Sequence, residues 1–218
     1  MAYDLEEQEQ LASLKAFWAK YGNVLTWVVI AALASYAGYN YWNAHVRAQS
    51  TEASGLYDEL LLSVQAKDNT KAQRIATDIK NKYGSTAYAE MAALGAAKTA
   101  FDANDLKTAK AQLQWVIDKG DDTYKAIARL RMAGVLLDEK AYDDSLKLVA
   151  AVTAPQFAGA AADRKGDILA AQNKLAEART AYLAALTAMD KGDPGRQLVA
   201  FKLEAIGGTV PAEAKPAA

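Results

Sequence analysis

Few residues in this chain could support acid–base, metal or nucleophilic chemistry. The sequence contains no cysteine, which excludes disulfides, thiol catalysis, Cys-based metal sites and an acylated lipoprotein cysteine. His45 is the single histidine, three residues past Trp42 and with no carboxylate beside it in sequence. We interpret it as an interfacial residue. The sequence also lacks a glycine-rich phosphate loop or a recognisable nucleophile motif. We therefore predict no catalytic residue, no metal site and no cofactor.

Two pairs of carboxylates have a structural explanation. Asp121 and Asp122 precede one predicted helix, and Asp143 and Asp144 precede another. Carboxylates at such positions accept hydrogen bonds from free backbone N–H groups and interact favourably with the positive end of the helix dipole. We predict that both pairs cap helices.

A dense charge cluster, Asp163–Asp167, falls within a later predicted helix. We interpret it as a solvated helix face that also forms ion pairs. The candidate partners of Asp163 and Asp167 are Arg129 and Arg131 of the neighbouring hairpin. One residue of the cluster could instead face a partner protein, and the sequence does not indicate which.

Composition predicts an all-α protein with no nucleic-acid partner. The 218-residue chain has four prolines, and 52% of its residues are hydrophobic. This scarcity of proline, together with abundant alanine, favours helices. The formal net charge of −1 gives no electrostatic reason to expect nucleic acid.

One segment near the N-terminus predicts a membrane-spanning helix. Residues 21–44 carry no charged side chain, and the 19 residues Val24–Trp42 are predominantly apolar. Nineteen helical residues span about 28 Å, close to the thickness of the hydrocarbon layer. Ala32–Ala34 matches a signal-peptidase pattern, but it lies inside the apolar run, so we predict an uncleaved signal anchor. The predicted boundaries are a cytoplasmic segment at 1–22 and a transmembrane helix at 23–44.

Flanking charge predicts the orientation of this helix. Lys15 and Lys20 precede it, whereas Arg47 alone follows closely. Basic residues favour the cytoplasmic side, so we predict a cytoplasmic N-terminus and a large domain on the far side of the membrane. Membrane lipid is then one partner of the chain.

A stripe of small residues lies along one side of the predicted span. Ala31, Ala34, Ser35 and Gly38 follow the i, i+3, i+4, i+7 spacing of one helix face. In lipid, such a stripe allows another helix to approach closely. These residues are candidates for helix packing in the membrane, although small residues also occur there by chance.

Beyond the membrane, the sequence predicts stacked helical hairpins over residues 45–206. Segments of similar length are separated by breaks at Lys67–Asn69, Tyr83–Gly84, Ala103–Asn104, Lys119–Gly120, Glu139–Lys140, Thr153–Pro155, Asn173–Lys174 and Lys191–Pro194. Small residues recur at intervals of 37, 36 and 33, at Ala72, Ala109, Ser145 and Ala178. Twelve positions before them lie Leu60, Ala97, Ala133 and Gly166. Helix pairs of this period with small residues at the crossing are typical of tetratricopeptide repeats.

The C-terminal end predicts a cap and a tail. Residues 197–205 place Leu198, Phe201 and Ala205 on one side of a helix, which we expect to cover the last hairpin. Residues 207–218 are rich in Gly, Pro, Ala and Lys and are predicted to be a disordered tail.

Several motifs together resemble the YfgM family of proteobacterial inner-membrane proteins. They are the acidic start with Ala16–Trp18, the exit motif Tyr41–His45, Ala111–Gln114, Arg129–Arg131 and Asp163–Asp167. The resemblance covers nearly the whole chain except the tail from Gly207.

This resemblance implies an ancillary subunit of the Sec translocon in the bacterial inner membrane, with a single span and a periplasmic tetratricopeptide-like domain. It implies association with translocon subunits and with a membrane-anchored periplasmic chaperone of the prolyl-isomerase type, in support of secreted and outer-membrane proteins. A link between the cytoplasmic end and an envelope-stress response regulator is also implied, and no catalytic residues are. The alternative hypothesis is an envelope scaffold that ties cell-wall or division machinery to the inner membrane.

Overall fold

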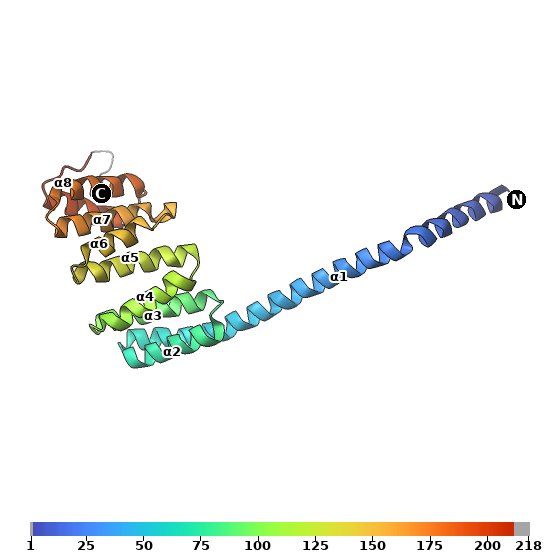
Figure 1. The fold of residues 1–218 in the computed structure, drawn as a ribbon, viewed down its shortest axis with the longest axis horizontal. Coiled ribbons are helices and arrows are strands. Elements are labelled where there is room, and N and C mark those ends of the chain that lie inside the picture. Colours follow the sequence, from blue (N-terminus) through green and yellow to red (C-terminus); the bar gives the residue numbers. More distant parts are fainter. Residues whose placement is uncertain (1, 212–218) are drawn as a thin grey trace. The chain divides into compact units, whose positions relative to one another are not determined.

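The computed structural model describes the backbone of residues 2–211 and the side chains of residues 7–211. Every regular element within that range is helical, so the predicted all-α fold is confirmed. The elements are α1 (Ala2–Gln65), α2 (Asn69–Tyr83), α3 (Ala87–Asp102), α4 (Leu106–Lys119), α5 (Asp122–Asp138), α6 (Tyr142–Ala150), a 3-10 turn η1 (Pro155–Phe157), α7 (Ala158–Ala171), α8 (Leu175–Ala188) and α9 (Gly195–Ala205) (Figure 1).

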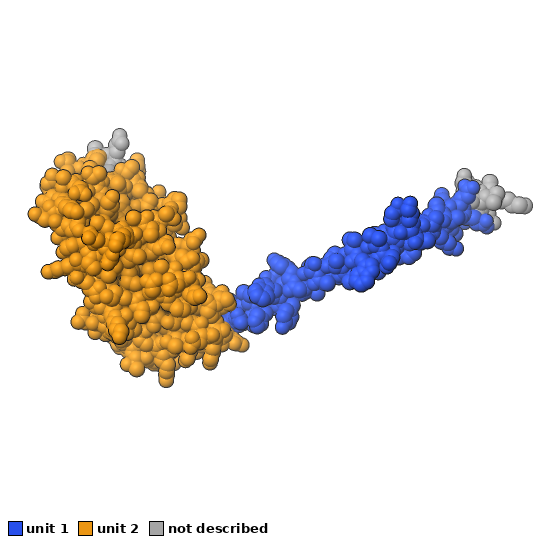
Figure 2. Space-filling model, in the orientation of Figure 1, with its two compact units in different colours: residues 1–51 blue, residues 52–218 orange. Residues whose placement is uncertain are grey.

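The chain divides into two compact units. The first comprises residues 1–51 and the second residues 52–218 (Figure 2). The described part of the first unit is the N-terminal portion of α1. The last residues of α1, 52–65, belong to the second unit and form the first helix of its first hairpin.

The first unit exposes its large apolar side chains. Trp18, Trp27, Tyr36 and Trp42 are all at least 60% exposed, from 61% for Trp18 to 67% for Tyr36. Among the described residues, α1 is the one helix long and apolar enough to cross a membrane, and only 6% of its apolar window is buried. A core helix of a soluble protein would bury such side chains. This helix is therefore compatible with a single membrane anchor.

The second unit is an array of helical hairpins. The pairs are the end of α1 with α2, α3 with α4, α5 with α6, and α7 with α8, and α9 packs on α8. First helices of successive hairpins also touch, α3 with α5 and α5 with α7. The core is a series of four clusters, each joining a hairpin to the helix that follows it. Such stacking of neighbour on neighbour is the solenoid arrangement.

The recurring small residues lie where the helices of a hairpin cross. Ala72, Ala109, Ser145 and Ala178 are fully buried. The Ser145 hydroxyl donates a 2.7 Å hydrogen bond to the carbonyl of Ala133, its counterpart in the first helix. The close approach of α5 and α6 thus depends on short side chains, because bulkier ones would push the helices apart.

The fourth hairpin shows how tight this crossing can become. A Cβ atom added at Gly166 would lie 2.4 Å from the ring of Tyr182, which is buried. Glycine in α7 therefore makes room for the large aromatic side chain of α8. At this crossing the large side chain therefore comes from α8, and α7 contributes no side chain.

The turn inside each hairpin repeats one backbone conformation. Lys67, Asn104, Lys140 and Asn173 are the described non-glycine residues with positive φ, between 55° and 61°. Each lies between the two helices of a hairpin, and the next N–H closes back onto a carbonyl five residues earlier, as from Ala141 to Leu136 at 2.8 Å. This is the hydrogen bond of a Schellman motif, which ends the first helix.

The predicted orientation of the capping helix is wrong. Leu198 and Phe201 are each 58% exposed, and α9 instead buries Val199, Leu203 and Arg196. The reason is that Arg196 donates from one guanidinium nitrogen to the carbonyl oxygens of Leu186 and Met189 at the end of α8. Those contacts turn the Val199–Leu203 side inward. α9 still covers the last hairpin, because Val199 and Leu203 belong to the core cluster of that hairpin.

The predicted tail lies partly within the described residues. Gly207 adopts a left-handed φ of 74°, and Val210 packs against the last core cluster. Arg179 donates two hydrogen bonds, at 2.8 and 2.6 Å, to the carbonyl of Ile206 just before the tail. Residues 212–218 lie outside the described residues.

Candidate functional site

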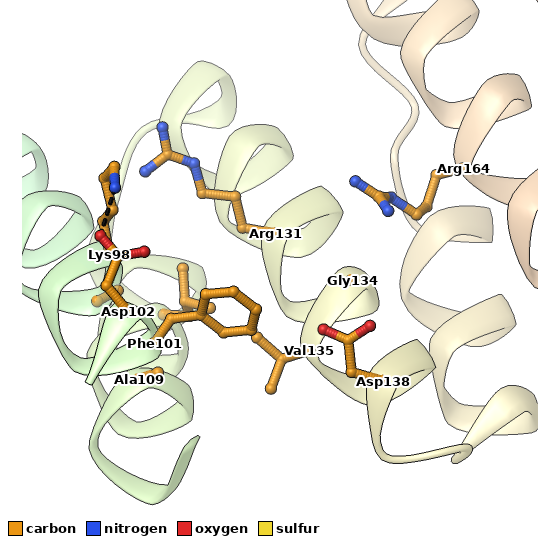
Figure 3. Close-up of a pocket in the computed structure, with 11 residues that line it drawn as sticks. Lys98, Phe101, Asp102, Ala109, Arg131, Gly134, Val135, Asp138 and Arg164 are labelled. Carbon is orange, nitrogen blue, oxygen red and sulfur yellow. Dashed lines mark hydrogen bonds and ion pairs between the residues drawn. The ribbon is translucent and has the colours of Figure 1, made fainter. Parts of the chain in front are cut away.

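A hollow lined by charged and apolar side chains lies along the first helices of successive hairpins. We call it the α3–α5–α7 pocket, and its volume is about 440 Å³. Its lining comes chiefly from α3 and α5, with Arg164 contributed by α7 and Ala109 and Leu113 by α4 (Figure 3). The pocket lies on the surface where α3, α5 and α7 run beside one another.

Apolar groups form the floor of the α3–α5–α7 pocket. Phe101 and Val135 face each other across it, and Phe101 is 41% exposed (Figure 3). Leu113 and two alanines complete this surface. An exposed phenylalanine beside buried aliphatic groups offers apolar area that a partner could cover.

Three cations surround this floor, and they differ in their partners. Lys98 forms an ion pair of 2.5 Å with Asp102 one turn later on α3. Arg164 lies 3.6 Å from Asp167, a loose contact. Arg131 donates one 3.3 Å hydrogen bond to the carbonyl of Leu94 and has no carboxylate oxygen of a described residue within ion-pair distance.

The environment of Arg131 is partly desolvated. Burial lowers the pKa of its guanidinium from the usual range, and the nearby Tyr57 opposes that shift. Arginine nevertheless stays charged at neutral pH. A cation with few partners in a partly dry pocket gains from a carboxylate that supplies both charge and acceptors.

The charge cluster of α7 forms ion pairs as predicted, but the predicted cations, Arg129 and Arg131, are wrong. Asp163 and Asp167 pair with Lys202 of α9, each at 2.8 Å, rather than with Arg129 or Arg131. Arg129 donates instead to the carbonyl of Ala151 at 2.9 Å. Lys202 follows the buried Val199 by three residues and so reaches α7 from the inward side of α9. The cluster therefore joins the cap to the last hairpin.

This network changes the proton affinities of its members. Desolvation is the largest cause raising the pKa of Asp163, and the Lys202 hydrogen bond opposes it. Desolvation is also the largest cause raising the pKa of Tyr182, followed by the charge of Asp167. The Tyr182 hydroxyl donates to Asp167 at 2.9 Å. Every polar group here has a partner inside the protein, which is typical of a structural network.

Of the two carboxylate pairs predicted to cap helices, one contributes a cap and the other does not. Asp121 is the N-cap of α5 and accepts from the N–H of Tyr124 at 2.9 Å. The cap predicted at Asp143 and Asp144 is wrong: both lie inside the first turn of α6, the N-cap position is Ala141, and Asp144 pairs with Lys147 at 2.8 Å. Asp105, which caps α4, has its pKa lowered by hydrogen bonds from Thr108.

His45 lies on the exposed first unit. Its ring stacks on Tyr41 with an interplanar angle of 8°, and Nε2 lies 3.1 Å from the Gln49 side-chain nitrogen. Within the described part of the chain, no group of three or more His, Cys, Asp and Glu residues is arranged to hold a metal ion.

The helix-packing candidates of the first unit face outward. Ala31, Ala34, Ser35 and Gly38 are exposed, and a Cβ added at Gly38 would meet nothing within 4 Å. The Ser35 hydroxyl donates back to the Ala31 carbonyl at 2.8 Å, so it is satisfied within its own helix. The stripe is thus available to a neighbouring helix, and its use for packing remains a prediction.

Sequence reasoning did not identify the α3–α5–α7 pocket. Lys98, Phe101, Arg131 and Asp138 come from two hairpins, and only the stacking of α3 on α5 brings them together. A signal was present in the repeat itself. Lys98 and Gly134 each follow the small crossing residue of their first helix by one position, so they occupy equivalent places in successive repeats.

Comparison with known proteins gives consistent results along the chain. The family model described as a tetratricopeptide repeat-like domain matches residues 15–208. A protein of Neisseria gonorrhoeae named ancillary SecYEG translocon subunit is 32% identical over 94% of this chain and 100% of its own length. Proteins of the same name from Escherichia coli K12 and Haemophilus influenzae are 31% and 29% identical, over 81% and 84% of this chain and 85% and 89% of theirs.

No solved structure matches the chain significantly. The sequence matches are sufficient to show the family, because they extend from the apolar helix to the last hairpin and cover one relative over its whole length. The chain therefore belongs to the YfgM family of tetratricopeptide repeat-like proteins, whose curated members are named ancillary SecYEG translocon subunits.

Proposed function

We propose that this protein is a non-enzymatic, membrane-anchored adaptor at the Sec translocon. The observation that carries the proposal is similarity over 94% of the chain to a relative named ancillary SecYEG translocon subunit. The two units fit that role: an exposed apolar helix suits lipid, and an array of hairpins offers surface for proteins. A membrane tether raises the local concentration of the array near its partners, so weak contacts suffice.

The proposed orientation places the N-terminus in the cytoplasm and the hairpin array in the periplasm. Lys15 and Lys20 before the apolar stretch and Arg47 after it support this direction. In this arrangement, the array lies at the exit side of the translocon, where secreted chains emerge. Residues 1–22 would remain on the cytoplasmic side.

The proposed partners of the array are proteins that act on emerging chains. We propose a membrane-anchored periplasmic chaperone of the prolyl-isomerase type, which fits an adaptor that assists secreted and outer-membrane proteins. An envelope-stress response regulator is the proposed partner of the cytoplasmic segment. Both proposals rest on the resemblance to the YfgM family.

In-membrane photocrosslinking tests the adaptor proposal. A crosslinking amino acid is placed at Ala34 or Gly38, on the small-residue stripe, and at Val29 or Leu33 on the opposite side of the helix. The products are identified by quantitative mass spectrometry. We expect translocon subunits to be captured from Ala34 and Gly38 and much less from the two control positions.

The outcomes separate the alternatives. Equal capture of translocon subunits from both sides would leave the association standing but contradict the stripe as the packing face. Capture of cell-wall or division components in place of translocon subunits would contradict the adaptor proposal and support the envelope scaffold.

A further inference from the structure

We propose that residues 7–21 of α1 lie on the surface of the lipid bilayer, with one apolar face in the headgroup layer on the N-terminal side of the membrane. The inference rests on the membrane anchor of the proposed function and adds a second contact of the chain with lipid. We call the surface that makes this contact the juxtamembrane face. It is made of Leu11, Leu14, Phe17, Trp18 and Tyr21.

The first argument is that the apolar side chains gather on one side. On an α-helix, the five side chains of the juxtamembrane face fall within an arc of about 120°, the width of a face that a helix normally buries. Their exposed fractions run from 44% for Tyr21 to 61% for Leu14, so the rest of the described chain leaves them uncovered. The opposite side carries Glu9, Ala12 and Ala16. Such a helix is stabilised when its apolar face is removed from water.

The second argument is the distance of this face from the predicted span, whose apolar residues begin at Val24. A helix rises about 1.5 Å per residue, so a straight continuation would place Leu14 about 15 Å and Leu11 about 20 Å before Val24. The headgroup layer on each side of a bilayer is only about 5–8 Å thick. An upright helix would therefore leave both leucines in water, whereas a helix lying on the surface places the whole face in the lipid interface.

The third argument is the chemistry of the residues nearest the span. Trp18 and Tyr21 are of the two residue types enriched at membrane interfaces, because their rings have an apolar body and a polar group. The Phe17 and Tyr21 ring centroids lie 5.1 Å apart, and Nζ of Lys20 lies 5.2 Å from the Tyr21 centroid. The lysine stem thus runs along the edge of the face, where its ammonium group can reach lipid phosphates. The face also runs without a break into the exposed apolar stretch that follows, which makes lipid the common occupant of both.

The fourth argument is the residue at which the helix can bend. Gly22 is buried under Trp18, and a Cβ built on it would lie 3.0 Å from three indole atoms. The Thr26 hydroxyl donates a 2.7 Å hydrogen bond to the Gly22 carbonyl. Glycine weakens a helix, and a hydroxyl that bonds back to its own helix often bends it. Since α1 is helical on both sides of Gly22, a bend there turns residues 7–21 onto the surface and leaves both parts helical.

Charge indicates which property of the lipid holds the segment. Glu7 and Glu9 balance Lys15 and Lys20, so residues 7–21 carry no net charge. The affinity of such a helix for a membrane comes from its buried apolar area, because attraction to anionic lipid needs an excess of positive charge. The contact should therefore survive added salt.

Site-directed spin labelling of the full chain in vesicles of phosphatidylethanolamine and phosphatidylglycerol tests this inference. The chain has no cysteine, so one introduced cysteine carries the only label. Each label is exposed to oxygen, which concentrates in lipid, and to a polar nickel chelate present in the water on both sides of the vesicle membrane. The labelled variants are Leu11→Cys and Leu14→Cys on the face and, as matched controls, Ala12→Cys and Ala16→Cys on the opposite side.

The expected result is a difference between the two sides of one helix. The ratio of oxygen to nickel accessibility should be at least about threefold higher at the two leucine positions than at the two alanine positions, because the face lies about 5–10 Å into the interface. This difference should persist in about 0.5 M salt. Equal ratios at the four positions, or a difference that salt removes, would overturn the inference. So would labels at Leu11 and Leu14 that are shielded from both reagents and broadened by a neighbouring label, because a second copy of the chain would then cover the face.

A reference label at Val29→Cys, within the apolar stretch, separates this inference from the proposed function. A lipid-exposed Val29 label together with equal ratios at the four other positions removes only the juxtamembrane contact. A Val29 label that the nickel chelate reaches contradicts the membrane anchor itself. Thermal unfolding of the hairpin array establishes that each labelled variant is folded.

Discussion

The two units of this chain use apolar side chains in opposite ways. In residues 1–51 the large ones, such as Trp27 and Leu33, are 65% and 62% exposed. In the hairpin array the core is built largely from alanine, with Leu60, Leu113 and Leu186 fully or almost fully buried. One unit is apolar outside and the other apolar inside. The difference indicates two solvents, lipid for the first and water for the second.

Both units are helical, but their helices meet different physical requirements. A helix in lipid needs only length and apolar surface, whereas a helix in the array must fit its neighbours to within a methyl group. The array achieves this fit with small residues at each crossing and one repeated turn inside each hairpin. Substitutions in the array should therefore change its free energy of unfolding, whereas substitutions in the first unit should change membrane insertion.

The largest expected difference concerns truncation of leucine. Leu186→Ala should lower the free energy of unfolding of the array by about 2–5 kcal/mol, because it leaves a cavity in the last core cluster. Leu198→Ala, at an exposed position on α9, should change it by less than about 0.5 kcal/mol. Denaturant unfolding followed by circular dichroism measures both, and equal losses would show that α9 packs differently.

The complementary test introduces a charge into the first unit. Leu33→Arg should disfavour membrane insertion by about 2.5–3.5 kcal/mol, since the position lies near the middle of the apolar run. Unfolding of the hairpin array should stay unchanged. Insertion is measured by glycosylation mapping in microsomes, with Leu33→Ala as the control. Normal insertion of the arginine variant would argue against lipid as the solvent of this unit.

A smaller effect is expected where the cap meets the last hairpin. Lys202→Ala should cost about 1.5–3 kcal/mol, because Asp163 and Asp167 lose their shared cation. Lys165→Ala removes an exposed lysine of the same cluster and should be nearly neutral. Similar results for the two variants in thermal unfolding would mean that the network does not hold the cap.

The smallest expected effect concerns the hairpin turn. Lys140 has a φ of 60°, so Lys140→Gly should raise the stability of the array by about 0.5–1 kcal/mol by removing the strain of a left-handed residue. Lys140→Ala keeps a Cβ and should give no such gain. A stabilising alanine together with a neutral glycine would contradict the left-handed turn.

Much of the fold was predictable because it depends on local pattern. The predicted breaks at Lys67–Asn69 and Glu139–Lys140 coincide with the turns, since residues that favour helix ends interrupt a regular apolar pattern there. The spacing of the small residues predicted the hairpin period, because every hairpin meets the same steric limit at its crossing.

Two predictions were wrong because they depended on contacts between distant parts of the chain: the buried face of α9 and the cation that pairs with Asp163. Leu198 and Phe201 predicted the wrong inner face of α9 because apolar size was taken as the guide, whereas Arg196 is buried through hydrogen bonds to α8 carbonyls. The partner of Asp163 was likewise sought in the preceding hairpin, and Lys202 follows 39 residues later. The pocket around Arg131 joins separate hairpins, so no single sequence window contains it.

The most direct test of the account is quantitative mass spectrometry of proteins that purify with the full chain in mild detergent. A version with the apolar stretch replaced by an unrelated single span serves as the comparison. The account predicts that translocon subunits and a periplasmic chaperone are enriched with the native chain. Enrichment of cell-wall or division proteins in their place would contradict it.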